Sequence, residues 1–208
     1  MTKIKICGLM REEDVAAVNA FRPDYAGFIL APSRRRITRE QAERFSAMLA
    51  PEICPVGVFV DEEPDVIFSY VKSGVIRAVQ LHGHETVEET ARLKMRISEF
   101  HVPLIRAVRM ERRDDLTPWL SAPVDFLLLD AGSGGTGTKF DHSLIAGPDA
   151  VPIPWFLAGG MTPDNAAKAA QKLRPYAVDV SSGVETDGKK DPEKIRWMIE
   201  EIRGLTKR

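Results

Sequence analysis

Short apolar runs alternate along the chain with longer amphipathic stretches. The runs are rich in β-branched residues, which favours strands over helices. The pattern predicts eight strands, at Lys3–Cys7, Tyr25–Leu30, Pro55–Val60, Ala78–Leu81, Leu104–Val108, Asp125–Asp130, Trp155–Ala158 and Ala177–Val180. From Lys3 to Ala177, successive strands begin about 25 residues apart, a length that suits a repeated strand–helix unit.

Helix signals fall in the stretches between these strands. Glu12–Phe21 opens on acidic residues, which suit the amino end of a helix. Thr38 stands three residues before Gln41, the spacing of a capping box. Glu111–Leu120 is short and weakly patterned, so no regular helix is expected there. Proline opens three further helical stretches, at Pro64, Pro163 and Pro192, where its missing N–H costs nothing.

The order and character of these elements predict the fold class. Two runs, FLLLD and WFLA, are apolar on both faces, which is typical of parallel strands covered by helices or closed into a packed barrel. Eight regular units favour a single (β/α)8 barrel, with residues 1–208 as one domain. A doubly wound open sheet is the alternative. Gly132–Gly137 has the composition of a linker, but its place after a strand predicts a strand-to-helix loop.

Composition narrows the class of protein. The 208 residues carry 29 Lys and Arg against 30 Asp and Glu, a formal net charge of -1, which argues against a nucleic-acid partner. No apolar run approaches the roughly 20 residues that a membrane span needs. The first residues lack the features of a secretory signal, so a cytoplasmic protein is expected. Cys7 and Cys54 are too few for a disulfide framework and are expected at opposite ends of the barrel.

Candidate chemistry gathers where the predicted strands end, because barrels of this kind build their sites at the carboxyl ends of the strands. Cys7 ends the first strand and Asp130 ends the sixth. A thiolate can remove a proton, and a protonated carboxyl group can donate one, so the two are candidates for a base and an acid. The alternatives are a small buried apolar residue at Cys7 and a loop-capping carboxylate at Asp130.

Other residues at the same ends suit anion binding. Gly159-Gly160 and Ser182-Gly183 follow the seventh and eighth strands, where this fold often holds a phosphate group, although a tight turn is the simpler reading of each. Arg34-Arg35-Arg36 follows the second strand and is either a solvated loop or a site for an anionic substrate group. His82 and His84 lack a convincing third and fourth ligand, so a metal site is not expected.

Several motifs occur in order over nearly the whole chain. They are KICGL within Lys3–Leu9, GFIL and PSRRRI within Gly27–Ile37, PVGVFVDEEPD at Pro55–Asp65, AVQLHG at Ala78–Gly83, LLLDAGSGGTGTKFDHSLI at Leu127–Ile145, LAGGMTPDN at Leu157–Asn165, and AVDVSSGVE and GKKD within Ala177–Asp191. Together they resemble the phosphoribosylanthranilate isomerase family of tryptophan biosynthesis, and in combination they are highly specific to that family.

The resemblance implies an Amadori rearrangement that needs neither metal nor cofactor. It implies Cys7 as general base and Asp130 as general acid, with Gln80 and His82 as substrate-binding residues. Alignment on Ile37 gives Arg35 to the substrate carboxylate, with Arg34 and Arg36 as alternatives. The phosphate group is implied at Gly159, Gly160, Ser182 and Gly183. The expected partner is a small phosphosugar–anthranilate substrate.

Two other functions remain open from the sequence. A related sugar-phosphate isomerase of histidine biosynthesis, or one enzyme serving both pathways, would have an aspartate at the end of the first strand, where this chain has Cys7. A non-catalytic phosphosugar-binding barrel would have no need of both Cys7 and Asp130. The sequence leaves the oligomeric state open between a monomer and a homodimer.

Overall fold

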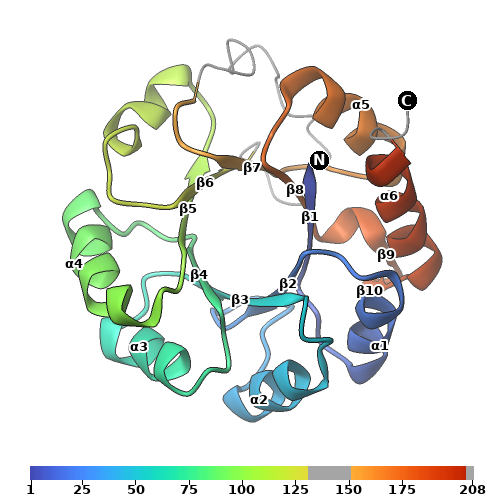
Figure 1. Cartoon of the computed structure of the whole chain (residues 1–208), viewed down its shortest axis with the longest axis horizontal. Coiled ribbons are helices and arrows are strands. Elements are labelled where there is room, and N and C mark those ends of the chain that lie inside the picture. The colour runs from blue at the N-terminus through green and yellow to red at the C-terminus, as the bar shows by residue number, and fades with distance from the viewer. Residues whose placement is uncertain (131–150, 205–208) are drawn as a thin grey trace.

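The computed structural model describes residues 1–130 and 151–204, and these form a closed ring of eight parallel strands surrounded by helices (Figure 1). The strands are β1 Lys3–Cys7, β2 Tyr25–Ile29, β3 Cys54–Phe59, β4 Ala78–Leu81, β5 Leu104–Arg109, β6 Phe126–Asp130, β7 Trp155–Leu157 and β8 Ala177–Val180. They pair in sequence order, and β8 pairs with β1 to close the barrel. The predicted (β/α)8 barrel is therefore confirmed.

Helices connect most of the strands. They are α1 Glu12–Phe21, α2 Arg39–Met48, α3 Pro64–Lys72, α4 Val87–Ile97, α5 Pro163–Leu173 and α6 Pro192–Gly204. Short 3-10 turns occur at η1 Ser98–Phe100, η2 Arg113–Trp119 and η4 Ser182–Val184, and β9 Glu185–Thr186 pairs with β10 Lys189–Lys190 in a small hairpin. The 3-10 turn η2 stands where no regular helix was predicted. The predicted loop at Gly132–Gly137 lies outside the described residues.

Local sequence signals account for the helix starts. The Thr38 hydroxyl accepts a hydrogen bond from the Gln41 amide, and the Gln41 side chain accepts one from the Thr38 amide. This reciprocal pair is the predicted capping box, and it satisfies two amides that the first turn of α2 leaves free. Pro64, Pro163 and Pro192 each occupy the first residue of their helix, as predicted.

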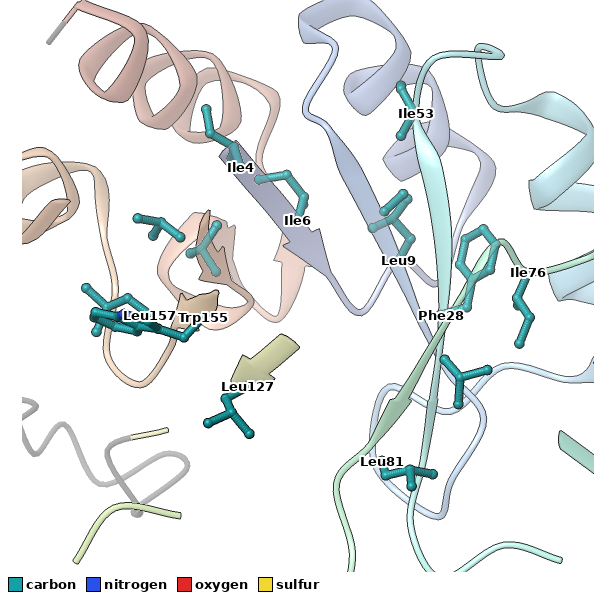
Figure 2. Packing of buried hydrophobic residues seen from close by; sticks show 14 of the residues in the cluster. Ile4, Ile6, Leu9, Phe28, Ile53, Ile76, Leu81, Leu127, Trp155 and Leu157 are labelled. Atoms are coloured by element: carbon teal, nitrogen blue, oxygen red, sulfur yellow. The ribbon is translucent and has the colours of Figure 1, made fainter. Parts of the chain in front are cut away.

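Alternation along the strands separates two apolar layers. Ile4 and Ile6 of β1 belong to the larger cluster, between the strands and the helices, where they pack with residues such as Ile195 and Met198 of α6. Figure 2 shows part of this layer, with Ile4 and Ile6 on β1, Leu127 on β6, and Trp155 and Leu157 on β7. The smaller cluster fills the barrel interior and contains Val56, Ala78, Ile105, Ala107, Leu128, Phe156, Ala158 and Ala177.

The strand direction sets the positions of the two cysteines. Cys7 is the last residue of β1 and Cys54 is the first residue of β3, so the two lie toward opposite ends of the barrel, and both are free thiols. The carboxyl ends of all eight strands lie at the same end of the barrel, here called the mouth, and Cys7 and Asp130 lie there. No helix in the two described stretches is both long and apolar enough to cross a membrane.

Candidate active site

Cys7 lies at the barrel mouth because it faces inward at the end of β1. It pairs in register with Gly27 of β2, and only 6% of its surface is exposed. A Cβ added to Gly27 would stand 2.7 Å from the Cys7 Sγ and 3.0 Å from the Cys7 Cα. The sulfur therefore occupies space that only a glycine at position 27 leaves free.

A buried ion pair lies in the layer below Cys7. Lys5 precedes Cys7 by two residues on β1, so the two side chains share the inner face of the barrel. The Lys5 Nζ is fully buried and lies 2.9 Å from the Oδ1 of Asp179, its register partner on β8. An ammonium group at this depth needs such a counter-ion, because removing an unpaired charge from water is costly.

The surroundings of Cys7 act on its ionisation in opposite directions. Burial raises the pKa of the Cys7 thiol, because a thiolate is poorly solvated there. The positive charge of Lys5 opposes this rise, the carboxylate of Asp179 adds to it, and Lys190 opposes it. The free protein therefore holds Cys7 mainly as a thiol, with two ammonium groups placed to stabilise the thiolate.

Asp130 faces the same mouth from β6. It follows Phe126 and Leu128 at even spacing, and these two residues pack in or against the inner apolar cluster. The His82 Nε2 lies 3.5 Å from the Asp130 Oδ2, and the His82 Nδ1 lies 2.9 Å from the Gln80 Nε2. Gln80, His82 and Asp130 therefore form one chain of contacts at the mouth.

Arg35 is the arginine of its triplet that turns toward the site. Its side chain is 16% exposed against 66% for Arg34, and Arg36 is exposed. The Arg35 Nε and Nη2 donate to the two carboxylate oxygens of Glu185 at 2.7 and 2.9 Å. Its Cδ lies 2.6 Å from the position of a Cβ added to Gly8, so Arg35 packs beside the loop that follows Cys7. This geometry favours Arg35 among the three candidates.

Glu185 joins Arg35 to a second buried cation. Its side chain is 5% exposed, and its Oε1 also accepts a hydrogen bond of 2.8 Å from the Lys190 Nζ. Burial alone would raise the pKa of the Glu185 carboxyl, but the hydrogen bonds and charges of Arg35 and Lys190 hold that pKa below its usual range. The Lys190 Nζ also donates to the Ser181 carbonyl at 2.9 Å, and the Ser181 hydroxyl donates to the Cys7 carbonyl at 3.0 Å.

The loops after β7 and β8 pack directly together. Gly159 and Gly160 have φ angles of +83° and +64°, in the left-handed region that favours glycine. A Cβ added to Gly183 would stand 1.9 Å from the carbonyl oxygen of Met161, so the β8 loop approaches the β7 loop backbone to backbone. Helix α5 begins just beyond, at Pro163. Exposed amides at such a junction, with a helix N-terminus behind them, suit a phosphate group.

His82 and His84 do not converge on a common point. His82 contacts Gln80 and Asp130, whereas His84, 95% exposed, contacts Asp61 through its Nδ1 at 2.9 Å. Within residues 1–130 and 151–204, no group of three His, Cys, Asp or Glu side chains is arranged to hold a metal ion.

Comparison with known proteins identifies the family. A profile described as N-(5'phosphoribosyl)anthranilate (PRA) isomerase matches residues 4–201. The chain belongs to the phosphoribosylanthranilate isomerase family. The resemblance found in the sequence is confirmed, and with it the expected class of enzyme.

Relatives in this family match the chain from end to end. N-(5'-phosphoribosyl)anthranilate isomerase of Acetivibrio thermocellus is 45% identical, over 98% of this chain and 96% of its own length. The enzyme of the same name from Endomicrobium trichonymphae is 44% identical, over 99% of this chain and 100% of its own length. The crystal structure of phosphoribosyl anthranilate isomerase from Thermotoga maritima is 37% identical with a TM-score of 0.86, and it covers 99% of this chain and 100% of its own. A related structure, at 38% identity and a TM-score of 0.84, holds reduced 1-(o-carboxyphenylamino)-1-deoxyribulose 5-phosphate.

Sequence reasoning missed four charged residues that support this isomerase-family site. Lys5 and Asp179 are internal to their strands, and Glu185 and Lys190 lie in the hairpin after β8. One signal for the first pair was available. Lys5 precedes Cys7 by two residues, and Asp179 precedes Ser181 by two. Because side chains alternate with a period of two along a strand, Lys5 lies on the same face as Cys7, and Asp179 lies on the same face as Ser181.

Proposed function

We propose that this chain catalyses the Amadori rearrangement of N-(5-phosphoribosyl)anthranilate to 1-(2-carboxyphenylamino)-1-deoxyribulose 5-phosphate, a step of tryptophan biosynthesis. Cys7 acts as general base and Asp130 as general acid. The reaction is an isomerisation, so no atom is gained or lost and no oxidant or reductant is needed. The proposed enzyme is one domain of residues 1–208.

The first step opens the sugar ring. Asp130, in its protonated form, gives its proton to the ring oxygen of the ribose, and the bond from that oxygen to C1′ breaks. The anthranilate nitrogen supplies the electron pair, so C1′ and the nitrogen form a Schiff-base cation. Support comes from the position of Asp130 at the end of β6 in the mouth, where its Oδ2 lies 3.5 Å from the His82 Nε2.

The second step moves the proton on C2′. The Schiff-base cation acidifies that C–H bond, so the Cys7 thiolate suffices to remove the proton, and the electron pair forms an enolamine. The enolamine loses its C2′ hydroxyl proton and gains a proton at C1′, which gives the ketone product. Cys7 suits this role because it ends β1 inside the mouth with Lys5 and Lys190 near its sulfur.

The ends of the substrate are held by separate groups. The anthranilate carboxylate binds Arg35, whose guanidinium is already oriented by Glu185. The phosphate binds the backbone amides of the loops at Gly159, Gly160, Ser182 and Gly183, where the two loops pack together. Gln80 and His82, in contact with each other beside Asp130, contact the sugar between these two ends.

One observation carries the proposal. A thiol and a carboxyl group end two strands on different sides of the same closed barrel, with Arg35 beside the loop that follows the thiol and a pair of glycine-containing loops after β7 and β8. A ring-opening acid and a C–H base must reach different atoms of one bound sugar, so they are needed on different sides of it. The family relatives carry the same activity in their names.

The test is an isomerisation assay. Phosphoribosylanthranilate is generated in place, and the loss of its anthranilate fluorescence is followed with the purified chain, with and without a chelator. Cys7→Ala and Asp130→Ala are run beside the wild type, and each is checked for folding by circular dichroism. We expect turnover that survives the chelator and falls at least 100-fold in each variant, the lower range of a general acid–base contribution.

Four outcomes would contradict parts of the proposal. A folded wild type without turnover would refute the proposed reaction, and the substrate of the related histidine-biosynthesis isomerase would then be tested. Full turnover in Cys7→Ala would refute Cys7 as the general base, and full turnover in Asp130→Ala would refute Asp130 as the general acid. Loss of turnover with the chelator alone would show that a metal ion takes part.

A further inference from the structure

The Lys5 ammonium is a buried charge that the reaction steps above do not use. Its Nζ is fully buried in the barrel interior, one side-chain layer below Cys7 on the same strand. The inner apolar cluster surrounds this level of the barrel. A lysine at such a position is unusual, since charged side chains are almost never fully buried without a partner.

The partner of Lys5 is Asp179, and stability gives no good reason for the pair. The two groups lie 2.9 Å apart on adjacent strands. Replacing a buried ion pair by well-packed apolar residues is often neutral or stabilising, because the desolvation cost of two charges offsets much of their attraction. A pair kept at the centre of a barrel, directly below a cysteine of the mouth, therefore points to a role at that cysteine.

We propose that Lys5, held by Asp179 beneath the barrel mouth, stabilises the thiolate form of Cys7 and so prepares it to remove a proton. Lys5 is a positioning residue, because it acts through Cys7 and touches no substrate. The catalytic value of this arrangement rests on the proposed function of Cys7 as the base, whereas the electrostatic effect on the thiol stands apart from it.

Burial disfavours the Cys7 thiolate, whereas the charged groups around Cys7 together favour it. Lys5 lies below it on β1, Asp179 approaches from β8 and Lys190 from β10, while its register partner on β2 is the uncharged Gly27. Burial lowers the pKa of Lys5, but the opposing interactions, of which the charge of Asp179 is the largest, leave that pKa raised, so Lys5 is positively charged at neutral pH. The attraction from Lys5 exceeds the repulsion from Asp179 at the Cys7 sulfur.

The two lysines differ in what else they do. Lys190 is tied to Glu185 and to the Ser181 carbonyl, so it also holds the hairpin in place. Lys5 interacts with Asp179 and with the Cys7 thiol, and neither contact belongs to the hairpin. Substitution of Lys5 therefore changes the charge below Cys7 without disturbing the Arg35 side of the mouth.

The test is to titrate Cys7 directly in the full-length protein. The chain is labelled with 13C at the cysteine Cβ, whose chemical shift reports thiol ionisation, and Cys7→Ala assigns the two signals. In Lys5→Met we expect the midpoint of the Cys7 titration (the Cys7 midpoint) to rise by about one pH unit. This corresponds to a tenfold loss of thiolate at a given pH below the midpoint. Cys54, at the far end of the barrel, serves as the internal reference and should not move.

Lys3→Met is the matched control. Lys3 shares β1 and the same alternation as Lys5, but it is half-exposed and pairs with Asp24 at the other end of the strand. We expect no change in the Cys7 midpoint in this variant. An unchanged or lowered midpoint in folded Lys5→Met, or an equal rise in Lys3→Met, would overturn the proposal.

A second variant covers the case in which Lys5→Met does not fold because Asp179 is left without a partner. Lys5→Met combined with Asp179→Asn leaves no unpaired charge in the barrel. The Cys7 midpoint should still rise, by less than in Lys5→Met, because the larger attraction is removed together with the smaller repulsion. A midpoint that stays or falls would overturn the proposal. Failure of the base assignment is a separate result. It would appear as full turnover in Cys7→Ala, while the rise of the Cys7 midpoint in Lys5→Met would still be observed.

Discussion

The Cys7 sulfur lies 2.7 Å from the place where a side chain at Gly27 would begin. The Cα of Cys7 is only 3.0 Å from that place, so movement of the side chain alone cannot make room. We therefore expect Gly27→Ala to push β1 and β2 apart at the mouth. Turnover should fall at least about tenfold, and the free energy of unfolding should fall by roughly 1–3 kcal/mol, as in other overpacked interiors.

Gly204→Ala is the control for this variant. A Cβ added to Gly204 meets no atom within 4 Å, and the residue ends α6 away from the mouth. Turnover and urea unfolding of the two variants are measured together. Wild-type turnover in Gly27→Ala would mean that the close approach of the two strands does not position the thiol.

Most of the fold follows from the sequence because one signal, a short apolar run that predicts a strand, recurs eight times. Lys3–Cys7, Ala78–Leu81 and Ala177–Val180 are found with the predicted bounds. The third strand is shifted by one residue at both ends, and the other four differ by one residue at one end. Those differences arise at strand ends, where pairing with a neighbour decides the last residue. Cys54, for example, joins β3 because it pairs with Tyr25.

The site was predictable only as far as the strand ends mark it. Cys7, Asp130 and the two glycine pairs could be placed at one mouth from their positions in the chain alone. The Arg35–Glu185 contact joins residues 150 apart, and nothing in the local sequence specifies it. Long-range pairing of this kind depends on closure of the barrel, so the local sequence does not show that Arg35 is the least exposed of the three arginines and pairs with Glu185.

Arg35 gives the clearest test of substrate recognition. Arg35→Met removes the inward guanidinium, while Arg34→Met removes a mostly exposed one. A hydrogen bond to a charged group contributes about 1.5–3 kcal/mol, so the KM of Arg35→Met should rise roughly 10- to 150-fold. KM in Arg34→Met should change less than about threefold, as expected of a surface ion pair. Equal KM values in the two variants would refute the assignment of Arg35.

Gly183 controls the packing of the two loops assigned to phosphate. A Cβ in Gly183→Ala would stand 1.9 Å from the Met161 carbonyl oxygen, so the loops must separate. We expect KM to rise about tenfold or more while kcat changes less, because the bound phosphate is remote from the atoms that react. Inhibition by inorganic phosphate should weaken in parallel. A variant with unaltered phosphate inhibition would show that the phosphate lies elsewhere.

The Glu185 carboxylate predicts how stability depends on pH. Its pKa in the folded protein is held below the usual range despite burial, because Arg35 and Lys190 stabilise the ionised form. A depressed folded pKa contributes stability that is present above the unfolded pKa and is lost as pH falls through the folded one. Urea unfolding should therefore show this contribution in full near pH 7 and show it declining below about pH 4.5.

Glu185→Gln isolates this contribution from the other carboxylates. The variant leaves Arg35 and Lys190 without their shared counter-ion, so it should unfold more easily than the wild type at pH 7, by about 3 kcal/mol. The difference should shrink as pH falls, because the wild type then loses the same negative charge. Glu43→Gln is the matched control, since Glu43 forms only an exposed pair with Arg39 on α2. A wild-type–variant difference that stays constant from pH 7 to about pH 3 would mean that the ionisation of Glu185 does not stabilise the fold.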